Sequence, residues 1–441
     1  MLQAGDEPLR RELTLLDSTM INVGTMIGSG IFIVPATIAL YVHSSLLVVG
    51  VWVLAGGVSL LGALSVAELS AAYPRAGGQF VYLEKAYGPL WGFLYGWTAF
   101  LVINTASIAA ISVGFSTYLG HFLPMSPGWI TSCAIASTIV LTALNCYRLK
   151  LGAVTQNIFT ILKISALAAL CLLGLFSSSA SVGNLHPLLP DLSISDLAGP
   201  FSLAMIAALW SYDGWIEITY IAGEVKNPGR NLPLSIIYST LLVIALYTVL
   251  SYAAITVLSV SSMANSELVA ADLAGVVLGP IGAGLVVIAI LVATIGANNG
   301  IVFTAARIPY AMAREGLFFK SLANVHPTFG TPLTALVVQC VLTCLLTLSG
   351  TYDRLYTYVV FASWLFYAMS SFSVIVLRRK DPDVQRPYKT WGYPVVPVLF
   401  VLFAIALTVY TIVEDPVSSL IGGGIILLGI PVYFFWRRGK E

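Results

Sequence analysis

Three small residues inside a long apolar run are the first group in this sequence that could do chemistry. Gly28, Ser29 and Gly30 stand in the stretch T-M-I-G-S-G-I-F, and each glycine destabilises a helix by about 1 kcal/mol relative to alanine. If the run crosses a bilayer, its helix should break near the midplane, where lipid satisfies no freed N–H or C=O group. The break must then face protein or a water-filled cavity.

A broken helix presents opposite partial charges at its two inner ends. The N–H groups that begin the outer half, near Ser29, suit a carboxylate. The carbonyls that end the inner half, at Met26 and Ile27, suit an ammonium group. The alternative interpretation is a packing motif, in which small residues let two helices approach closely.

A second interruption, W-S-Y-D-G-W, stands in the sixth apolar run. Asp213 and Gly214 are costly in a lipid-facing helix, so this run should break too. Interrupted helices at matching positions in two halves of a chain point to the binding site of a transporter. Asp213 is either a ligand for substrate or protons or, in the interpretation we favour, bonds to its own backbone.

Lys163 is the most informative charge, because it falls in the middle of the fifth apolar run. It stands about 18 Å from the inner end of that run, too far for its stem to reach the headgroups. It must therefore face the bundle and find acceptors. We hypothesise that it bridges the first break to the fifth span and couples occupancy to inward opening. The alternative is a lysine that carbonyls satisfy for stability alone.

Other polar residues within the spans have roles that the sequence leaves open. Glu217 either pairs with Lys163 or lines the cavity, and Glu68 should anchor a cytoplasmic loop. Four more are candidates for pocket or gate residues, with packing between helices as the alternative: Asn104, Tyr247, Asn298 and Asn299.

Membrane-spanning helices are needed to position these residues. The chain has 441 residues, 58% of them hydrophobic and 9% charged, against about 25% charged in soluble domains. It is therefore predicted to be an all-α polytopic membrane protein, a single transporter domain over 1–441. Runs of about 20 apolar residues predict about twelve spans: 13–40, 45–72, 90–119, 129–146, 151–176, 197–222, 232–260, 281–313, 332–348, 355–377, 395–413 and 418–436.

The spacing of the two breaks predicts internal symmetry. Five spans separate the starts of broken helices 1 and 6, so the sixth enters from the opposite side of the membrane. Segments 13–176 and 197–377 should therefore form a 5+5 inverted repeat. The segment 395–436 adds two further helices.

Basic residues predict the orientation. Arg or Lys follows every even-numbered span, as at Arg148, and closes the chain, as at Lys440, whereas Arg354 alone lies on the opposite side. By the positive-inside rule both termini are cytoplasmic, in a multi-pass protein of the plasma membrane. The first residues show no signal-peptide pattern.

The motifs together resemble a known family. G-S-G-I-F, W-S-Y-D-G-W and G-E-V-K-N-P-G-R-N-L-P are similar to the L-type amino acid transporters of the amino acid–polyamine–organocation superfamily. So are the loops Y-P-R-A-G-G-Q-F-V-Y-L-E-K-A-Y-G-P and R-I-P-Y-A-M-A-R-E-G-L-F-F-K. The resemblance covers about 13–393. It implies a LeuT-type fold of ten core helices plus two, and sodium-independent exchange of amino acids.

The resemblance also implies roles for single residues. Trp210 matches an aromatic gate over bound substrate, with packing between helices as the alternative. The carbonyls of Trp210 and Ser211 would join those of the first break around the α-ammonium. Lys163 matches a lysine of sodium-independent members, whose ammonium replaces the cation that sodium-coupled relatives hold near the first break.

Cysteine placement bears on possible partners. Eukaryotic members that pair with a heavy-chain glycoprotein have a cysteine between the third and fourth spans, where this chain reads H-F-L-P-M-S-P-G. All five cysteines fall within or at the ends of predicted spans. We therefore expect no disulfide framework and no disulfide-linked heavy chain, as in stand-alone bacterial members.

Two transport functions remain at this point. The main hypothesis is a sodium-independent exchanger of neutral L-amino acids. Asp213 and Glu217 keep open a proton-coupled carrier of cationic amino acids or polyamines. An enzyme is not expected, because the four histidines lie at span ends or in loops, away from any nucleophile or metal-ligand cluster. The expected partners are an amino acid and the lipid bilayer, with no cofactor, metal or nucleic acid.

Overall fold

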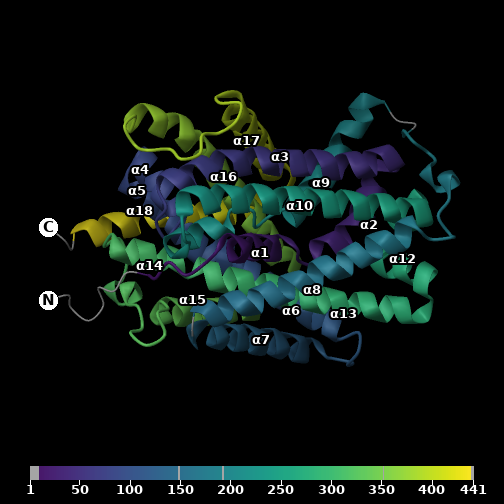
Figure 1. The fold of residues 1–441 in the computed structure, drawn as a ribbon, viewed down its shortest axis with the longest axis horizontal. Helices are drawn as coiled ribbons and strands as arrows, with labels where there is room; N and C mark the ends of the chain where they lie inside the picture. Colours follow the sequence, from purple (N-terminus) through teal and green to yellow (C-terminus); the bar gives the residue numbers. More distant parts are fainter. Residues whose placement is uncertain (1–8, 148, 191–192, 351, 439–441) are drawn as a thin grey trace.

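The computed structural model describes residues 9–147, 149–190, 193–350 and 352–438 (Figure 1), with side chains for all of these except 194–195, 352–361 and 438. Arg148, Lys440 and the side chain of Arg354, which entered the prediction of orientation, lie outside this part of the chain.

Helices account for nearly all of the regular structure, and most run along the long axis of the molecule (Figure 1). The α-helices are α1 (Leu15–Met26), α2 (Gly30–Val42), α3 (Ser45–Ala72), α4 (Gln79–Tyr87), α5 (Pro89–Thr98), α6 (Asn104–Leu119), α7 (Pro127–Tyr147), α8 (Leu149–Leu175), α9 (Ile194–Ser211), α10 (Pro228–Val257), α11 (Val260–Ala264), α12 (Val269–Leu278), α13 (Pro280–Ala305), α14 (Arg307–Arg314), α15 (Leu333–Ser349), α16 (Tyr352–Lys380), α17 (Val395–Glu414) and α18 (Pro416–Arg438). Four shorter helical elements join them: η1 (Ala99–Ile103), η2 (Val182–Leu185), η3 (Glu217–Glu224) and η4 (Lys320–Ala323).

The helix lengths agree with a protein that spans a membrane. Within the described residues, eight helices are long and apolar enough to cross a bilayer, or nine if α1 and α2 form one bent span. Both ends of the described chain lie at the same end of the molecule (Figure 1). The prediction of an all-α polytopic membrane protein is confirmed, while the count of twelve spans and the inverted repeat stay predictions.

Both predicted breaks are present. Helix α1 ends at Met26 and α2 begins at Gly30, with a bend of 44° between them. Helix α9 ends at Ser211, and the next helical element, the 3₁₀ segment η3, begins at Glu217. Gly214 in the second break has a φ of +108°, which glycine adopts far more readily than residues with a Cβ.

Glu68 holds the loop that follows α16, as expected. Its carboxylate pairs with Arg378 at 2.6 Å and with Arg386 at 3.4 Å. It also accepts a hydrogen bond from the N–H of Thr390 at 2.7 Å. The loop is thereby tied to the end of α3.

A second buried ion pair joins η3 to α14. The Nε of Arg307 lies 2.8 Å from Oε1 of Glu224, its Nη2 lies 3.1 Å from Oε2, and neither side chain is exposed. The main-chain oxygen of Glu224 accepts hydrogen bonds from the N–H groups of Glu12 and Leu13. The pair therefore fixes the place where the N-terminal segment meets the end of the second broken helix.

Substituting Arg307 by methionine is expected to lower the free energy of unfolding by about 3–5 kcal/mol, because Glu224 would keep a buried, unpaired charge. Arg75→Met is the control: Arg75 also pairs with a carboxylate, that of Glu315, but its side chain is 50% exposed, and such pairs contribute about 1 kcal/mol or less. Denaturant titration in mixed detergent micelles measures both variants. Equal losses in the two would contradict the expected role of burial.

Candidate functional site

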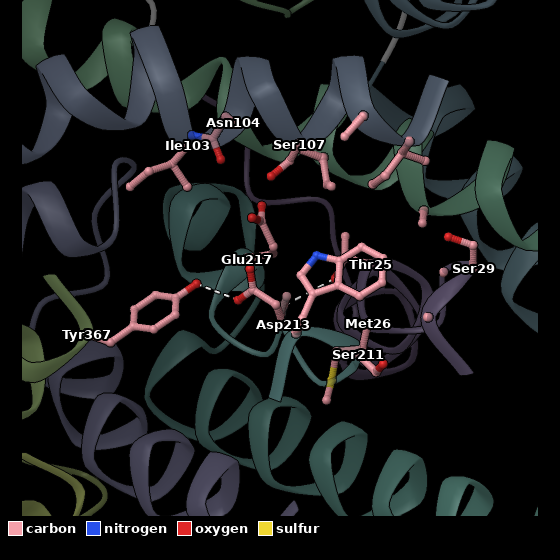
Figure 2. A pocket seen from close by; sticks show the side chains of 18 residues that line it. Thr25, Met26, Ser29, Ile103, Asn104, Ser107, Ser211, Asp213, Glu217 and Tyr367 are labelled. Atoms are coloured by element: carbon pink, nitrogen blue, oxygen red, sulfur yellow. Dashed lines mark hydrogen bonds between the residues drawn. The ribbon is translucent and has the colours of Figure 1, made fainter. Parts of the chain in front are cut away.

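The two helix breaks face a common cavity of about 70 Å³ (Figure 2). The first break contributes residues from Thr25 to Gly30 to its wall, and the second contributes residues from Trp210 to Glu217. Helices α6, α13 and α16, with the last residue of η1, supply the remaining walls. Segments almost 200 residues apart in sequence are therefore neighbours around one chamber.

Direct contacts hold the breaks against each other. The hydroxyl of Thr25 donates to the carbonyl of Gly214 at 3.2 Å. A Cβ on Gly214 would lie 3.0 Å from the carbonyl carbon of Thr25, and a Cβ on Gly30 would lie 2.6 Å from the hydroxyl oxygen of Ser211. The two glycines therefore allow an approach that a larger residue would prevent.

The outer half-helix offers two N–H groups to the cavity. The N–H of Gly28, the first of the predicted trio, donates to the carbonyl of Met26 at 3.1 Å. No acceptor of the described chain meets the N–H groups of Ser29 or Gly30, and both residues line the cavity. They lie at the N-terminus of α2, where the helix dipole favours an anion.

Of the four carbonyls expected to meet an ammonium group, those of Met26, Ile27 and Trp210 are already engaged; that of Trp210 accepts from the N–H of Asp213 at 3.0 Å. The carbonyl of Met26 also accepts from the hydroxyl of Tyr247 at 3.0 Å, and that of Ile27 accepts from Lys163 at 2.9 Å. Within the described chain no donor reaches the carbonyls of Thr25 and Ser211, two residues that line the cavity. The sequence analysis did not single out Thr25, although its place in the last turn of α1 is a signal for a free carbonyl.

Lys163 lies behind the first break and is not among the residues that line the cavity. It is 2% exposed and donates to the carbonyls of Gly24, at 2.6 Å, and Ile27, at 2.9 Å. Gly296 of α13 leaves room for it, since a Cβ there would lie 2.7 Å from Cε of the lysine. The structure thus contains the bridge between α8 and the first break, while its role in coupling stays a prediction.

Two carboxyl groups at the second break line the cavity. Asp213 accepts a hydrogen bond from the hydroxyl of Tyr367 at 2.6 Å (Figure 2). Glu217 accepts one from the hydroxyl of Thr304. Glu217 therefore lines the cavity and does not pair with Lys163, which answers the question that the sequence left open.

The four remaining candidates divide between the cavity and the packing around it. Asn104 lines the cavity directly after η1, a π-helical stretch that the sequence analysis did not predict; such turns recur at functional sites. Tyr247, Asn298 and Asn299 are not among the lining residues. Asn298 donates to Ser112, and Asn299 bonds to Asn145 and Gln156.

Trp210 is the last residue but one of α9 and lines the cavity. Its position agrees with either a gate or a packed aromatic residue. Taken together, the lining supplies N–H donors at one helix end, carbonyl acceptors beside them, and carboxyl groups farther along the wall. This arrangement can hold a small molecule that carries both a negative and a positive charge.

Comparison with known proteins bears on the same question. Residues 13–435 match the family model of the amino acid permeases. The serine/threonine exchanger SteT of Bacillus subtilis is 32% identical over 99% of both chains. The b(0,+)-type amino acid transporter 1 of Mus musculus is 32% identical over 97% of this chain and 88% of its own. The large neutral amino acids transporter small subunit 2 of Homo sapiens is 33% identical over 98% and 82%.

Proposed function

Because the chain belongs to the amino acid permease family, we propose that it is a sodium-independent exchanger of small neutral L-amino acids. Membership makes it a multi-pass membrane transporter of amino acids with a LeuT-like fold, and not an enzyme. To this family assignment we add three proposals: the substrate is neutral, it is small, and its transport does not require sodium.

The observation that carries the proposal is the set of unengaged main-chain groups around the cavity. The N–H groups of Ser29 and Gly30 suit the substrate carboxylate. The carbonyls of Thr25 and Ser211 suit its α-ammonium, and Trp210 lies beside them as the proposed gate. Such a site binds the part that all amino acids share and leaves the side chain to the cavity walls.

The size of the cavity favours small substrates. The cavity of about 70 Å³ is small beside the roughly 300–1,000 Å³ of typical ligand pockets. It therefore suits alanine or serine better than tryptophan or arginine. The printed name of the relative SteT, a serine/threonine exchanger, agrees with this range.

Lys163 supports the independence from sodium. Its ammonium lies against two carbonyls of the first break, Gly24 and Ile27, which are oxygen ligands of the kind that a bound cation would use. The Nζ of Lys163 already occupies these two oxygens, so they are not available to a sodium ion. Amino acid exchange then proceeds with no metal ion as a partner.

The proposed transport cycle is alternating access. The halves 13–176 and 197–377 would rock around the fixed site as inverted repeats of a twelve-span bundle, with 395–436 outside the core. Both termini would lie in the cytoplasm, with the protein in the plasma membrane. We propose that it works without a disulfide-linked heavy chain.

Reconstituted vesicles test the exchange. Radiolabelled alanine or serine should enter vesicles that contain unlabelled amino acid about tenfold faster than empty ones, and replacing external sodium by choline should change nothing. The binding site of an exchanger reopens to the outside fastest when an amino acid from the inside is bound. Uptake therefore depends on internal amino acid. Equal uptake into loaded and empty vesicles, or uptake that requires sodium, would contradict the proposal.

A second function keeps support from Asp213 and Glu217, because both carboxyl groups line the cavity. A proton-coupled carrier of cationic amino acids or polyamines would use them as ligands for protons or for a positive side chain. The same vesicles separate the two functions. Proton coupling requires uptake of lysine or putrescine that follows an imposed pH gradient into empty vesicles.

A further inference from the structure

Glu217 is one of the polar groups in the cavity wall that the proposed recognition by main-chain groups does not use. Its side chain is largely buried, with the residue 7% exposed, and the hydroxyl of Thr304 donates to its Oε2. No donor of the described chain reaches its Oε1. Figure 2 shows the carboxyl turned into the cavity, on the side of Asn104 and Ser107. Oε1 is therefore open to the cavity, where a substrate donor would stabilise it.

Asn104 lies in the same wall but offers no donor to the cavity. Its amide nitrogen is buried, and Figure 2 shows the amide oxygen on the cavity side. A hydroxyl group both donates and accepts hydrogen bonds. A substrate hydroxyl can therefore donate to the carboxyl of Glu217, whereas a methyl group cannot.

The place of Glu217 assigns it to the substrate side chain. The N–H groups of Ser29 and Gly30 and the carbonyls of Thr25 and Ser211 already account for both charged groups of an amino acid, if the proposed function is correct. We propose that Glu217 is the specificity-determining residue of this site and selects small amino acids whose side chain carries a hydroxyl. This inference rests on the proposed function and names its substrate class.

The test compares three substrates that differ at one atom group: L-serine, L-alanine and L-2,3-diaminopropionate. Their exchange is measured with the full-length protein in vesicles, as kcat/KM. The variants are Glu217→Leu, which removes the acceptor, and Glu217→Gln, which keeps a weaker, uncharged one. Glu267→Gln is the matched control, because Glu267 is an exposed acid in the stretch between α11 and α12.

The wild type should favour serine over alanine by about tenfold, the effect of one good hydrogen bond. Glu217→Leu should abolish this preference, because serine exchange should fall about tenfold more than alanine exchange. Glu217→Gln should lie between them, and Glu267→Gln should match the wild type. If Glu217→Leu does not fold, serine should still raise the unfolding temperature of the wild type more than alanine at equal concentration.

Three results would overturn the inference. An equal fall of serine and alanine exchange in Glu217→Leu would assign Glu217 to the α-ammonium or to structure alone. If the wild type exchanges serine and alanine equally well, the site has no selectivity for a hydroxyl that Glu217 could cause. A preference for diaminopropionate over serine would assign it to a positive charge. Failure of the wild type to exchange any of the three would instead contradict the proposed function itself.

Discussion

Lys163→Ala is expected to lower the rate of amino acid exchange by about 100-fold. The substitution removes two hydrogen bonds from a charged donor, each contributing about 1.5–3 kcal/mol, and leaves the carbonyls of Gly24 and Ile27 buried without a partner. The end of α1 is then no longer tied to α8. Exchange in vesicles measures the rate, and the shift of the unfolding temperature on adding substrate measures binding.

Lys150→Ala is the matched control for this variant. Lys150 lies on the same helix, α8, but is exposed, so its removal should leave exchange unchanged. A Lys163→Ala protein that folds and binds substrate but exchanges slowly would support a role in coupling. Exchange at the wild-type rate would contradict it, and equal losses of folding and exchange would indicate a lysine retained for stability alone.

Gly214→Ala is expected to lower exchange by about tenfold or more. A Cβ at this position would lie 3.0 Å from the carbonyl carbon of Thr25 and 3.1 Å from the nitrogen of Met26. These are backbone atoms, so no side-chain rotation relieves the contact. The two breaks must move apart by a few tenths of an ångström, which displaces the carbonyls and N–H groups that are proposed to bind the substrate.

Gly88→Ala separates this displacement from the cost of an unusual backbone conformation. Gly88 has a φ of +103°, close to the +108° of Gly214, but a Cβ there would meet nothing within 4 Å. Both variants should lose about 1–3 kcal/mol of stability from the positive φ. Gly214→Ala alone should also lose exchange. Similar exchange in the two variants would show that the contact between the breaks is not needed.

The breaks themselves could be predicted because their causes are local. Glycines within an apolar run weaken the helix, and the bilayer allows exposed backbone groups only where they face a cavity. The structure ends α1 at Met26 and α9 at Ser211, as the sequence indicated. The prediction that Lys163 must find acceptors within the bundle followed from length and reach alone, and its two carbonyl partners agree with it.

The identity of the free carbonyls could not be predicted in this way. The sequence pointed to Met26 and Ile27, but Tyr247 and Lys163, on α10 and α8, donate to these two carbonyls. The carbonyl of Thr25, one position earlier, has no donor in the described chain. Donors that lie more than 130 residues away in the chain reach the break only through the packing of helices, and no local pattern records that packing.

The surroundings of Asp213 and Glu217 were likewise predictable only in part. The sequence showed that Asp213 and Glu217 lie in or near a break, and therefore that lipid could not be their environment. Their hydrogen-bond partners, Tyr367 and Thr304, come from α16 and α13. Those two helices decide that Glu217 lines the cavity and does not meet Lys163.

By itself, the sequence determined that this is an all-α membrane protein, that two of its helices break, and that it resembles a family of amino acid transporters. These properties can be predicted because hydrophobicity, glycine content and motifs are local features of the sequence. Only the tertiary structure decided that both breaks open into one chamber and which main-chain groups remain free there. Those features depend on which side chains from distant helices reach the backbone first, and that is a property of three-dimensional packing.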